Sequence, residues 1–239
     1  SMGEEFVKGI DRYCLWLPNI TEDELSELPA ISKRVEKCRI WRSEQTKSGD
    51  AYKLSDRPHL LRPTTKFKDQ AYIGVPVVTS ARRKYVPFGF VFDGMIPGNK
   101  LFFLNTDSLY LFGILMSQSH NAWMRAVAGR MKTDYSYAST IVYNNFVFPD
   151  TTDLGRKSIE GAAQRVLDAR KTYPDASLAD LYDPDNESKY PELTAAHEAL
   201  DKAVERAFGW ELDDLTWDEK ETFIVSSLFE LYSQKVNAE

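Results

Sequence analysis

The chain has few of the residues on which most catalytic and metal sites depend. Cys14 and Cys38 are its only cysteines, and two lone thiols give neither a metal-binding spacing nor a disulfide framework. Such cysteine use favours a reducing, cytoplasmic setting. The three histidines are far apart and share no ligand motif. Glycine-rich phosphate loops and nucleophile elbows are also missing from the sequence. We therefore expect no catalytic residue and no metal ion in this chain.

Long apolar segments are missing as well. No run approaches the roughly 18 to 20 residues that span a bilayer, and the N-terminus lacks a secretory pattern. We therefore expect no membrane partner. A hydrophobic fraction of 43% with 13% aromatics is typical of a globular protein with a real core. Ser1 and Met2 resemble a cloning remnant. The strand-like RYCLWL (12–17) follows almost at once, so we expect a fragment cut from a longer protein.

Charge is distributed unevenly along the 239 residues, whose formal net charge is −6. Residues 1–150 hold 20 Lys and Arg against 16 Asp and Glu, whereas residues 151–239 hold 10 against 20. The segment from Lys33 to Lys84 is the most basic, with 14 against 5. A segregated basic region is typical of a surface that binds a polyanion. A solvated basic face would look the same, and charge alone does not choose between them.

The first 150 residues have the patterns of a mixed α/β domain. A capping box at Thr21 and Glu24 predicts a helix through Gln45, broken or kinked at Pro29. A helical block from 108 to 130 follows, with Asp107 as its N-cap and a break at 117–119. Strands are expected at 12–17, 71–78, 86–92, 100–104 and 140–148.

After Pro149 only amphipathic helical stripes remain. The sequence therefore predicts an α+β fold, with a mixed α/β domain that contains a β-sheet at 3–150, followed by an all-α helical bundle or extension at 151–239. The polar loop between these helices contains Asp185, Glu187 and Lys189, which superficially resemble the acidic and lysine residues of a restriction nuclease. In such nucleases the first aspartate and the Glu-x-Lys pair lie on separate strands, so we reject this interpretation.

Lys132 and Asp134 are the best candidates for base recognition. Residues spaced by two lie on one face of a strand, and Ser136 would continue that face. Lysine can donate to guanine O6 and N7, and aspartate can accept from cytosine N4. An ordinary surface ion pair between the two residues is the alternative.

Other cations are candidates for binding DNA phosphates. Arg82, Arg83 and Lys84 are adjacent at a predicted strand entrance, where they would project in different directions. The alternative is a charged loop kept for solubility. Arg130 near the end of a helix would equally stabilise the helix dipole. Lys66 and Lys68 lie in the same basic segment of the sequence as Arg82, Arg83 and Lys84.

The order of several segments resembles the C-terminal region of MmeI-like DNA adenine methyltransferases, which include fused type II restriction–modification enzymes. The segments that carry the resemblance, in order, are RYCLWL (12–17), LPAISKRVEKCRIWR (28–42), ARRKYVPFGF (81–90), FGILMSQSHNAWMRAVAGRMK (112–132), STIVYNNFVFP (139–149), LADLYDP (178–184) and ELTAAHEALDKAV (192–204). Together they cover nearly the whole chain.

The resemblance implies a target recognition domain followed by a C-terminal helical domain. In this family, side chains paired across neighbouring strands and loops set specificity, and Lys132 with Asp134 and Lys100 with Ser136 match two such pairs. It implies double-stranded DNA as a partner, together with the protein's own methyltransferase domain. S-adenosylmethionine would bind in that upstream domain, since this chain lacks an Asn-Pro-Pro-Tyr motif. The alternatives are a protein-interaction module, whose acidic helices dock a partner subunit, and a standalone enzyme.

Overall fold

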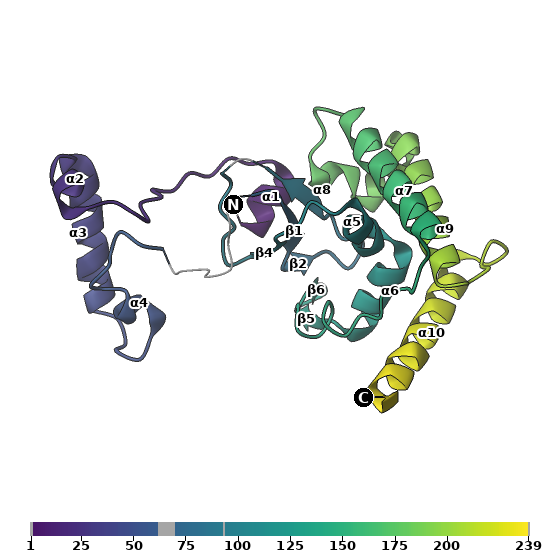
Figure 1. Cartoon of the computed structure of the whole chain (residues 1–239). Coiled ribbons are helices and arrows are strands. Elements are labelled where there is room, and N and C mark those ends of the chain that lie inside the picture. The colour runs from purple at the N-terminus through teal and green to yellow at the C-terminus, as the bar shows by residue number, and fades with distance from the viewer. Residues whose placement is uncertain (1, 62–69, 93, 239) are drawn as a thin grey trace. The chain divides into compact units, whose positions relative to one another are not determined.

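The structure is a computed structural model that describes residues 2–61, 70–92 and 94–238 (Figure 1). The chain forms two compact units. One contains Ser1–Arg12 together with Asp69–Glu239, and the other contains Tyr13–Lys68. The helices that follow residue 150 therefore pack in the same unit as the strands that precede it.

The unit Tyr13–Lys68 is helical. It contains α2 (Glu22–Ser26), α3 (Pro29–Ser43) and α4 (Asp50–Lys53). The predicted capping box forms, because the Thr21 hydroxyl accepts from the Glu24 N–H and the Glu24 carboxylate accepts from the Thr21 N–H. The predicted break is also confirmed, since Pro29 is the first residue of α3.

Arg42 is a structural cation in this unit. Its guanidinium is buried and donates hydrogen bonds of 2.8–3.2 Å to the carbonyl oxygens of Leu54, Arg57 and Leu60. The strand expected at 12–17 does not form, so that prediction was wrong. An alternating sequence becomes a strand only when its backbone finds a partner strand.

The other unit is built on two small antiparallel sheets. In the first, β1 (Tyr72–Pro76) lies between β3 (Gly89–Val91) and β4 (Leu101–Leu104). The second has the order β2 (Val78–Thr79), β6 (Asp134–Ser136), β5 (Gly129–Met131). Only Val77 separates β1 from β2, so one stretch of chain joins the two sheets. Three of the strands expected from sequence are thereby confirmed.

The N-terminal helix α1 (Gly3–Lys8) covers part of the first sheet. Gly74 and Gly89 lie opposite each other on β1 and β3, and a Cβ atom on either would lie within 3.2 Å of the Phe6 ring. These two glycines therefore make room for the Phe6 side chain of α1.

Helix α5 (Leu109–Met116) lies at the centre of the core, followed by α6 (Gln118–Val127). Residues 112–116 are all buried, as expected of a helix that is apolar on every side. The predicted break is confirmed at Ser117, which ends α5 and whose hydroxyl caps α6. The N-cap of α5 is Ser108, whose hydroxyl accepts from the Leu111 N–H, so the choice of Asp107 was wrong.

The strand expected at 140–148 was also wrong. Residues 140–145 form turns, in which the carbonyl oxygens of Ala138 and Ser139 accept hydrogen bonds from the N–H groups of Val142 and Asn144. The Trp123 indole N–H donates to the Val142 carbonyl over 2.9 Å, which ties these turns to α6. Trp123 and Met124 are core residues, as expected.

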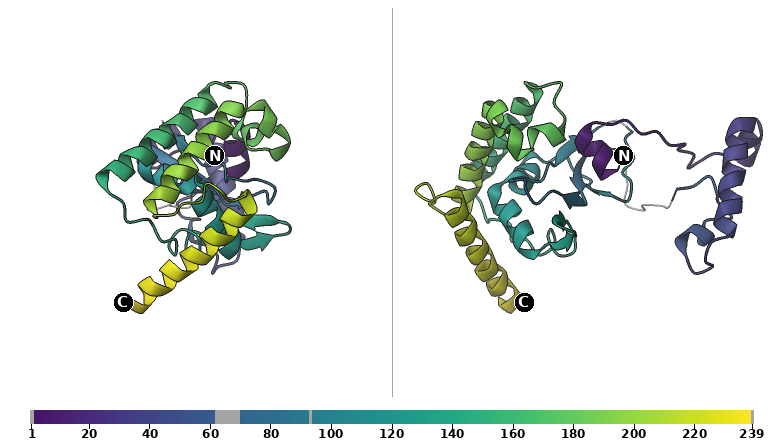
Figure 2. Two further views of the ribbon diagram at one scale, coloured as in Figure 1. Left: turned by 90° about the vertical axis from the view of Figure 1, so that its right-hand side faces the viewer. Right: turned by 180° about the vertical axis from the view of Figure 1, so that it is seen from behind.

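The C-terminal part contains helices only among its described residues. They are α7 (Asp153–Lys171), α8 (Leu178–Leu181), the 3-10 helix η1 (Pro184–Lys189), α9 (Pro191–Ala207) and α10 (Trp217–Ala238). Helices α7 and α9 lie side by side in both views of Figure 2, and α7 packs on α5. The predicted fold class, an α+β part followed by an all-α part, is confirmed.

Within the described ranges no helix combines the length and hydrophobicity needed to cross a membrane. In the same ranges, no three His, Cys, Asp or Glu side chains gather closely enough to bind a metal ion.

Candidate nucleic-acid interface

A β-hairpin carries three of the predicted base-reading residues. Strands β5 and β6 pair in antiparallel fashion, with Met131 opposite Asp134, so Lys132 and Thr133 form a two-residue loop. Lys132 has a φ of 59°, the left-handed conformation that tight hairpin loops require. Lys132 therefore lies in the turn and does not share a strand face with Asp134, which corrects the predicted geometry.

Asp134 and Ser136 do share one face of β6. Tyr135 between them is buried, whereas both neighbours are half-buried, as an alternating strand requires. One Asp134 carboxylate oxygen accepts from the Ala81 N–H over a long 3.4 Å, which leaves most of its acceptor capacity unused. Tyr137 is also buried, as predicted.

Lys100 lies in the turn before β4, and the fold brings it close to Ser136. The Lys100 carbonyl oxygen accepts from the Val77 N–H over 3.2 Å, and the Val77 carbonyl oxygen accepts from the Tyr137 N–H over 2.8 Å. The segment that holds Lys100 and the end of β6 are therefore both bonded to Val77, at the junction of the two sheets. The predicted pair Lys100 and Ser136 thus comes from neighbouring segments.

The two lysines of this region are exposed and unpaired. Lys100 and Lys132 both lie on the surface, and neither ammonium group has an ion-pair partner among the described residues. In particular, Lys132 and Asp134 do not form the surface ion pair that was the alternative to a base-reading role.

Two of the predicted phosphate-binding cations, by contrast, are paired within the chain. The Arg82 guanidinium contacts the Asp185 carboxylate, and the Lys84 ammonium lies 2.6 Å from a Glu187 carboxylate oxygen. Both acids belong to η1, the acidic segment whose resemblance to a nuclease site was rejected from the sequence. All four side chains remain substantially exposed to solvent, so these pairs are weak and screened by salt.

Arg83 turns towards the protein. Burial lowers the pKa of its guanidinium, an effect that the carboxylates of Asp183 and Asp134 partly offset. Its Nε is buried, and no hydrogen-bond partner for it lies among the described residues. The three adjacent cations therefore project in different directions, as predicted, but only Arg82 and Lys84 extend into solvent. Lys66 and Lys68, the remaining candidates, lie outside the described residues.

Arg125 has a structural role. It donates to both Glu221 carboxylate oxygens, over 2.7 and 2.9 Å, and to the Lys84 carbonyl oxygen over 2.8 Å. It therefore joins α6 and α10 to the turn that carries the basic cluster.

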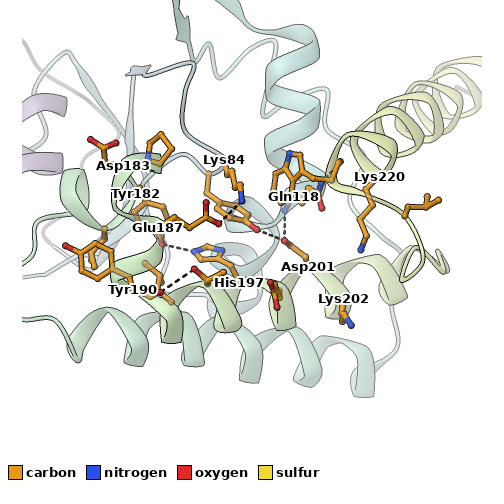
Figure 3. A pocket seen from close by; sticks show the side chains of 18 of the residues that line it. Lys84, Gln118, Tyr182, Asp183, Glu187, Tyr190, His197, Asp201, Lys202 and Lys220 are labelled. Atoms are coloured by element: carbon orange, nitrogen blue, oxygen red, sulfur yellow. Dashed lines mark hydrogen bonds and ion pairs between the residues drawn. The ribbon is translucent and has the colours of Figure 1, made fainter.

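Sequence patterns gave no sign of a polar network behind this turn. A cavity of about 360 Å³ lies between the turn, η1, α9 and the start of α10 (Figure 3). At its floor, buried Asp201 accepts from the Tyr85 hydroxyl and from the Gln118 N–H, each over 2.6 Å. Burial raises the pKa of Asp201 to about 7, although both hydrogen bonds act to lower it.

His197 lies beside Asp201 on α9, and its ring stacks on Tyr85 with centroids 4.0 Å apart. Arg170 donates twice to the Tyr182 hydroxyl oxygen, so that hydroxyl must donate its own proton to His197 Nε2, 2.8 Å away. Burial and the nearby Arg170 charge hold the pKa of His197 well below its usual value. His197 is thus a neutral, structural residue, as predicted.

The chain is similar to known proteins along its whole length. A family model described as MmeI, target recognition domain, matches residues 1–150, and one described as MmeI, C-terminal domain, matches residues 151–238. A solved structure of the type IIL restriction–modification enzyme MmeI in complex with DNA superposes with a TM-score of 0.91 at 32% identity over 99% of this chain. DNA methyltransferase A of Bacillus subtilis is 38% identical over 205 residues, which is 85% of this chain.

These relatives are much longer than the chain described here. It spans 23% of the Bacillus subtilis protein and 30% of the MmeI chain in the solved structure.

Proposed function

This chain belongs to the MmeI family, and we propose that it is the DNA sequence-recognition module of a longer DNA methyltransferase. In this proposal Lys132, Asp134, Lys100 and Ser136 contact base edges in the major groove. The observation that carries the proposal is the exposed hairpin, which has Lys132 in its loop and whose strand β6 ends next to the segment that holds the exposed Lys100. Exposed lysines near carboxylate and hydroxyl groups that can still accept hydrogen bonds can read both bases of a G·C pair.

The chemistry of the parent protein would take place elsewhere. We place S-adenosylmethionine and the adenine-modifying residues in a domain upstream of this chain, because the sequence contains neither an Asn-Pro-Pro-Tyr motif nor a glycine-rich cofactor loop. The catalytic domain would hold the duplex from its other side and extrude the adenine. The chain alone would then bind DNA weakly and modify nothing. A cytoplasmic setting belongs to the same proposal.

The experiment that tests this function measures the affinity of the 239-residue chain for a labelled duplex by fluorescence anisotropy at two salt concentrations. We expect weak binding that falls as salt rises, because phosphate contacts release counterions. The double variant Lys100→Ala/Lys132→Ala should bind several-fold more weakly than a control with the same charge change on α7, Lys157→Ala/Lys171→Ala. Failure of the folded wild-type chain to bind at low salt would refute the proposal.

The ion pairs of η1 lead to a second prediction. If Arg82 and Lys84 contact phosphates, DNA must first displace Asp185 and Glu187. The variant Asp185→Asn/Glu187→Gln should then bind DNA about 3- to 10-fold more tightly at low salt, since each exposed pair is worth up to about 1 kcal/mol. Glu160→Gln/Asp168→Asn on α7 is the matched control, because it removes two exposed, ion-paired acids from the same part of the chain. An equal gain in DNA affinity in the two variants would mean that the effect comes from the change in net charge alone.

A further inference from the structure

Arg130 was a candidate phosphate contact, but its surroundings favour another role. We infer that Arg130 is a positioning residue for base recognition, which fixes the loop that presents Lys132. This inference rests on the proposed function, because it concerns how the same hairpin reads DNA. It assigns Arg130 to the control of selectivity at one base pair, whereas a phosphate contact would contribute affinity for any sequence.

The Arg130 guanidinium is already engaged within the hairpin. Its Nη1 donates to the Thr133 carbonyl oxygen over 2.9 Å, and its Cζ lies 3.8 Å from the centroid of the Tyr135 ring. Tyr135 is the residue opposite Arg130 in the β5–β6 pairing. The planar guanidinium therefore forms a hydrogen bond with Thr133, the second loop residue, and stacks on the ring of Tyr135 in β6. A lysine could not make both contacts, because it lacks the flat guanidinium.

The loop needs such support because of its backbone. Lys132 is the one residue other than glycine with a positive φ among the described residues. A positive φ is unfavourable for a side chain such as lysine, and it persists where surrounding contacts determine the conformation. The hydrogen bond from Arg130 fixes the carbonyl group of Thr133, the residue that directly follows Lys132. Loss of this bond lets the loop relax, so that the Lys132 ammonium and the Asp134 carboxylate no longer keep a fixed spacing.

A phosphate contact would place different demands on the same residue. A phosphate would need only the positive charge and the guanidinium N–H donors that the Thr133 carbonyl leaves unused, and it would not need the stacked arrangement on the Tyr135 ring. The two roles also respond differently to Arg130→Lys. That variant keeps the positive charge that a phosphate needs, but loses the stacked and directed contacts on which the loop depends.

The test compares Arg130→Lys and Arg130→Gln with the wild-type chain. Each protein is incubated with a pool of duplexes of random sequence, and the bound fraction is sequenced to give the selectivity at every position. Affinity for an unselected duplex is measured as a function of salt. The control is Arg156→Gln on α7, which removes an arginine that also lies over a tyrosine, with 4.1 Å from Cζ to the Tyr110 ring centroid.

We expect both Arg130 variants to lose about tenfold in selectivity at a single base position, the value of one base contact. The other positions, the affinity for the unselected duplex and its salt dependence should stay as in wild type and in the Arg156→Gln control. The inference is overturned if Arg130→Lys behaves like wild type while Arg130→Gln weakens binding to all sequences and lowers the salt slope by about one, as a phosphate contact would. Absence of any enriched motif with the wild-type chain would instead refute the proposed function itself.

Discussion

Exchanging the charges of Lys132 and Asp134 will change which base pair is preferred at one position of the recognised sequence. The preference at that position will shift by roughly 5- to 150-fold, equivalent to 1–3 kcal/mol per base contact. Lysine donates to guanine O6 and N7, and aspartate accepts from cytosine N4, so the double variant Lys132→Asp/Asp134→Lys offers the same two groups in reversed order. Aspartate also tolerates the left-handed backbone of the loop better than most residues do. We therefore expect a preference for G·C at that position to become a preference for C·G.

The measurement is the same selection from a pool of random duplexes, or, in the full-length protein, the mapping of modified adenines. A suitable control is the exchange Asp168→Lys/Lys171→Asp on α7, which reverses an exposed pair with 3.1 Å between the charged atoms and leaves the net charge unchanged. A motif that is identical in wild type and in the Lys132/Asp134 exchange would show that these residues do not read bases. Loss of selectivity at many positions would mean that the exchange disrupts the hairpin as a whole.

Much of the fold was predictable because its signals are local. The capping box at Thr21, the proline that begins α3 and the serine that divides α5 from α6 each act within a few residues. Hydrophobic periodicity likewise predicted α7 and α9, whose apolar stripes are buried against the core. The two strands that failed, at 12–17 and 140–148, have suitable residues but no partner strand, which a sequence pattern does not reveal.

The site was harder to predict than the fold. A period of two placed Lys132 on a strand, but the chain reverses there in a two-residue loop that contains no glycine to mark it. The pairing of Arg82 with Asp185 and of Lys84 with Glu187 joins residues that are 103 positions apart in each case. Such contacts depend on tertiary packing, so the sequence showed the charges without their partners.

Removal of the buried carboxyl of Asp201 will stabilise the protein at high pH. Burial raises the pKa of Asp201 to about 7, above the value of about 4 in an unfolded chain. The folded protein therefore holds a proton that the unfolded chain has released, and stability falls as pH rises between these two values. Asp201→Asn keeps an oxygen for the Gln118 N–H and an amide that can donate to the Tyr85 hydroxyl oxygen, but it cannot ionise.

The informative quantity is the difference between the unfolding free energies of Asp201→Asn and wild type, because other groups titrate in the same range. Burial lowers the pKa of His120 to about 3 and that of His197 well below its usual value, and these two residues make stability rise with pH up to about 6.5. Their contribution is the same in both proteins and cancels in the difference. We expect this difference to shift by about 2–3 kcal/mol in favour of the variant between pH 5 and pH 8.

Urea denaturation at several pH values measures this difference directly. Asp201→Ala serves as the comparison, because it leaves the Gln118 N–H and the Tyr85 hydroxyl without an acceptor inside the core. That variant should be less stable than Asp201→Asn at every pH, by about 1–3 kcal/mol for each buried group left unpaired. Curves for wild type and Asp201→Asn that remain parallel from pH 5 to pH 8 would mean that Asp201 does not titrate in this range. Its carboxylate would then be stabilised by Lys220, whose charge lowers the pKa of Asp201.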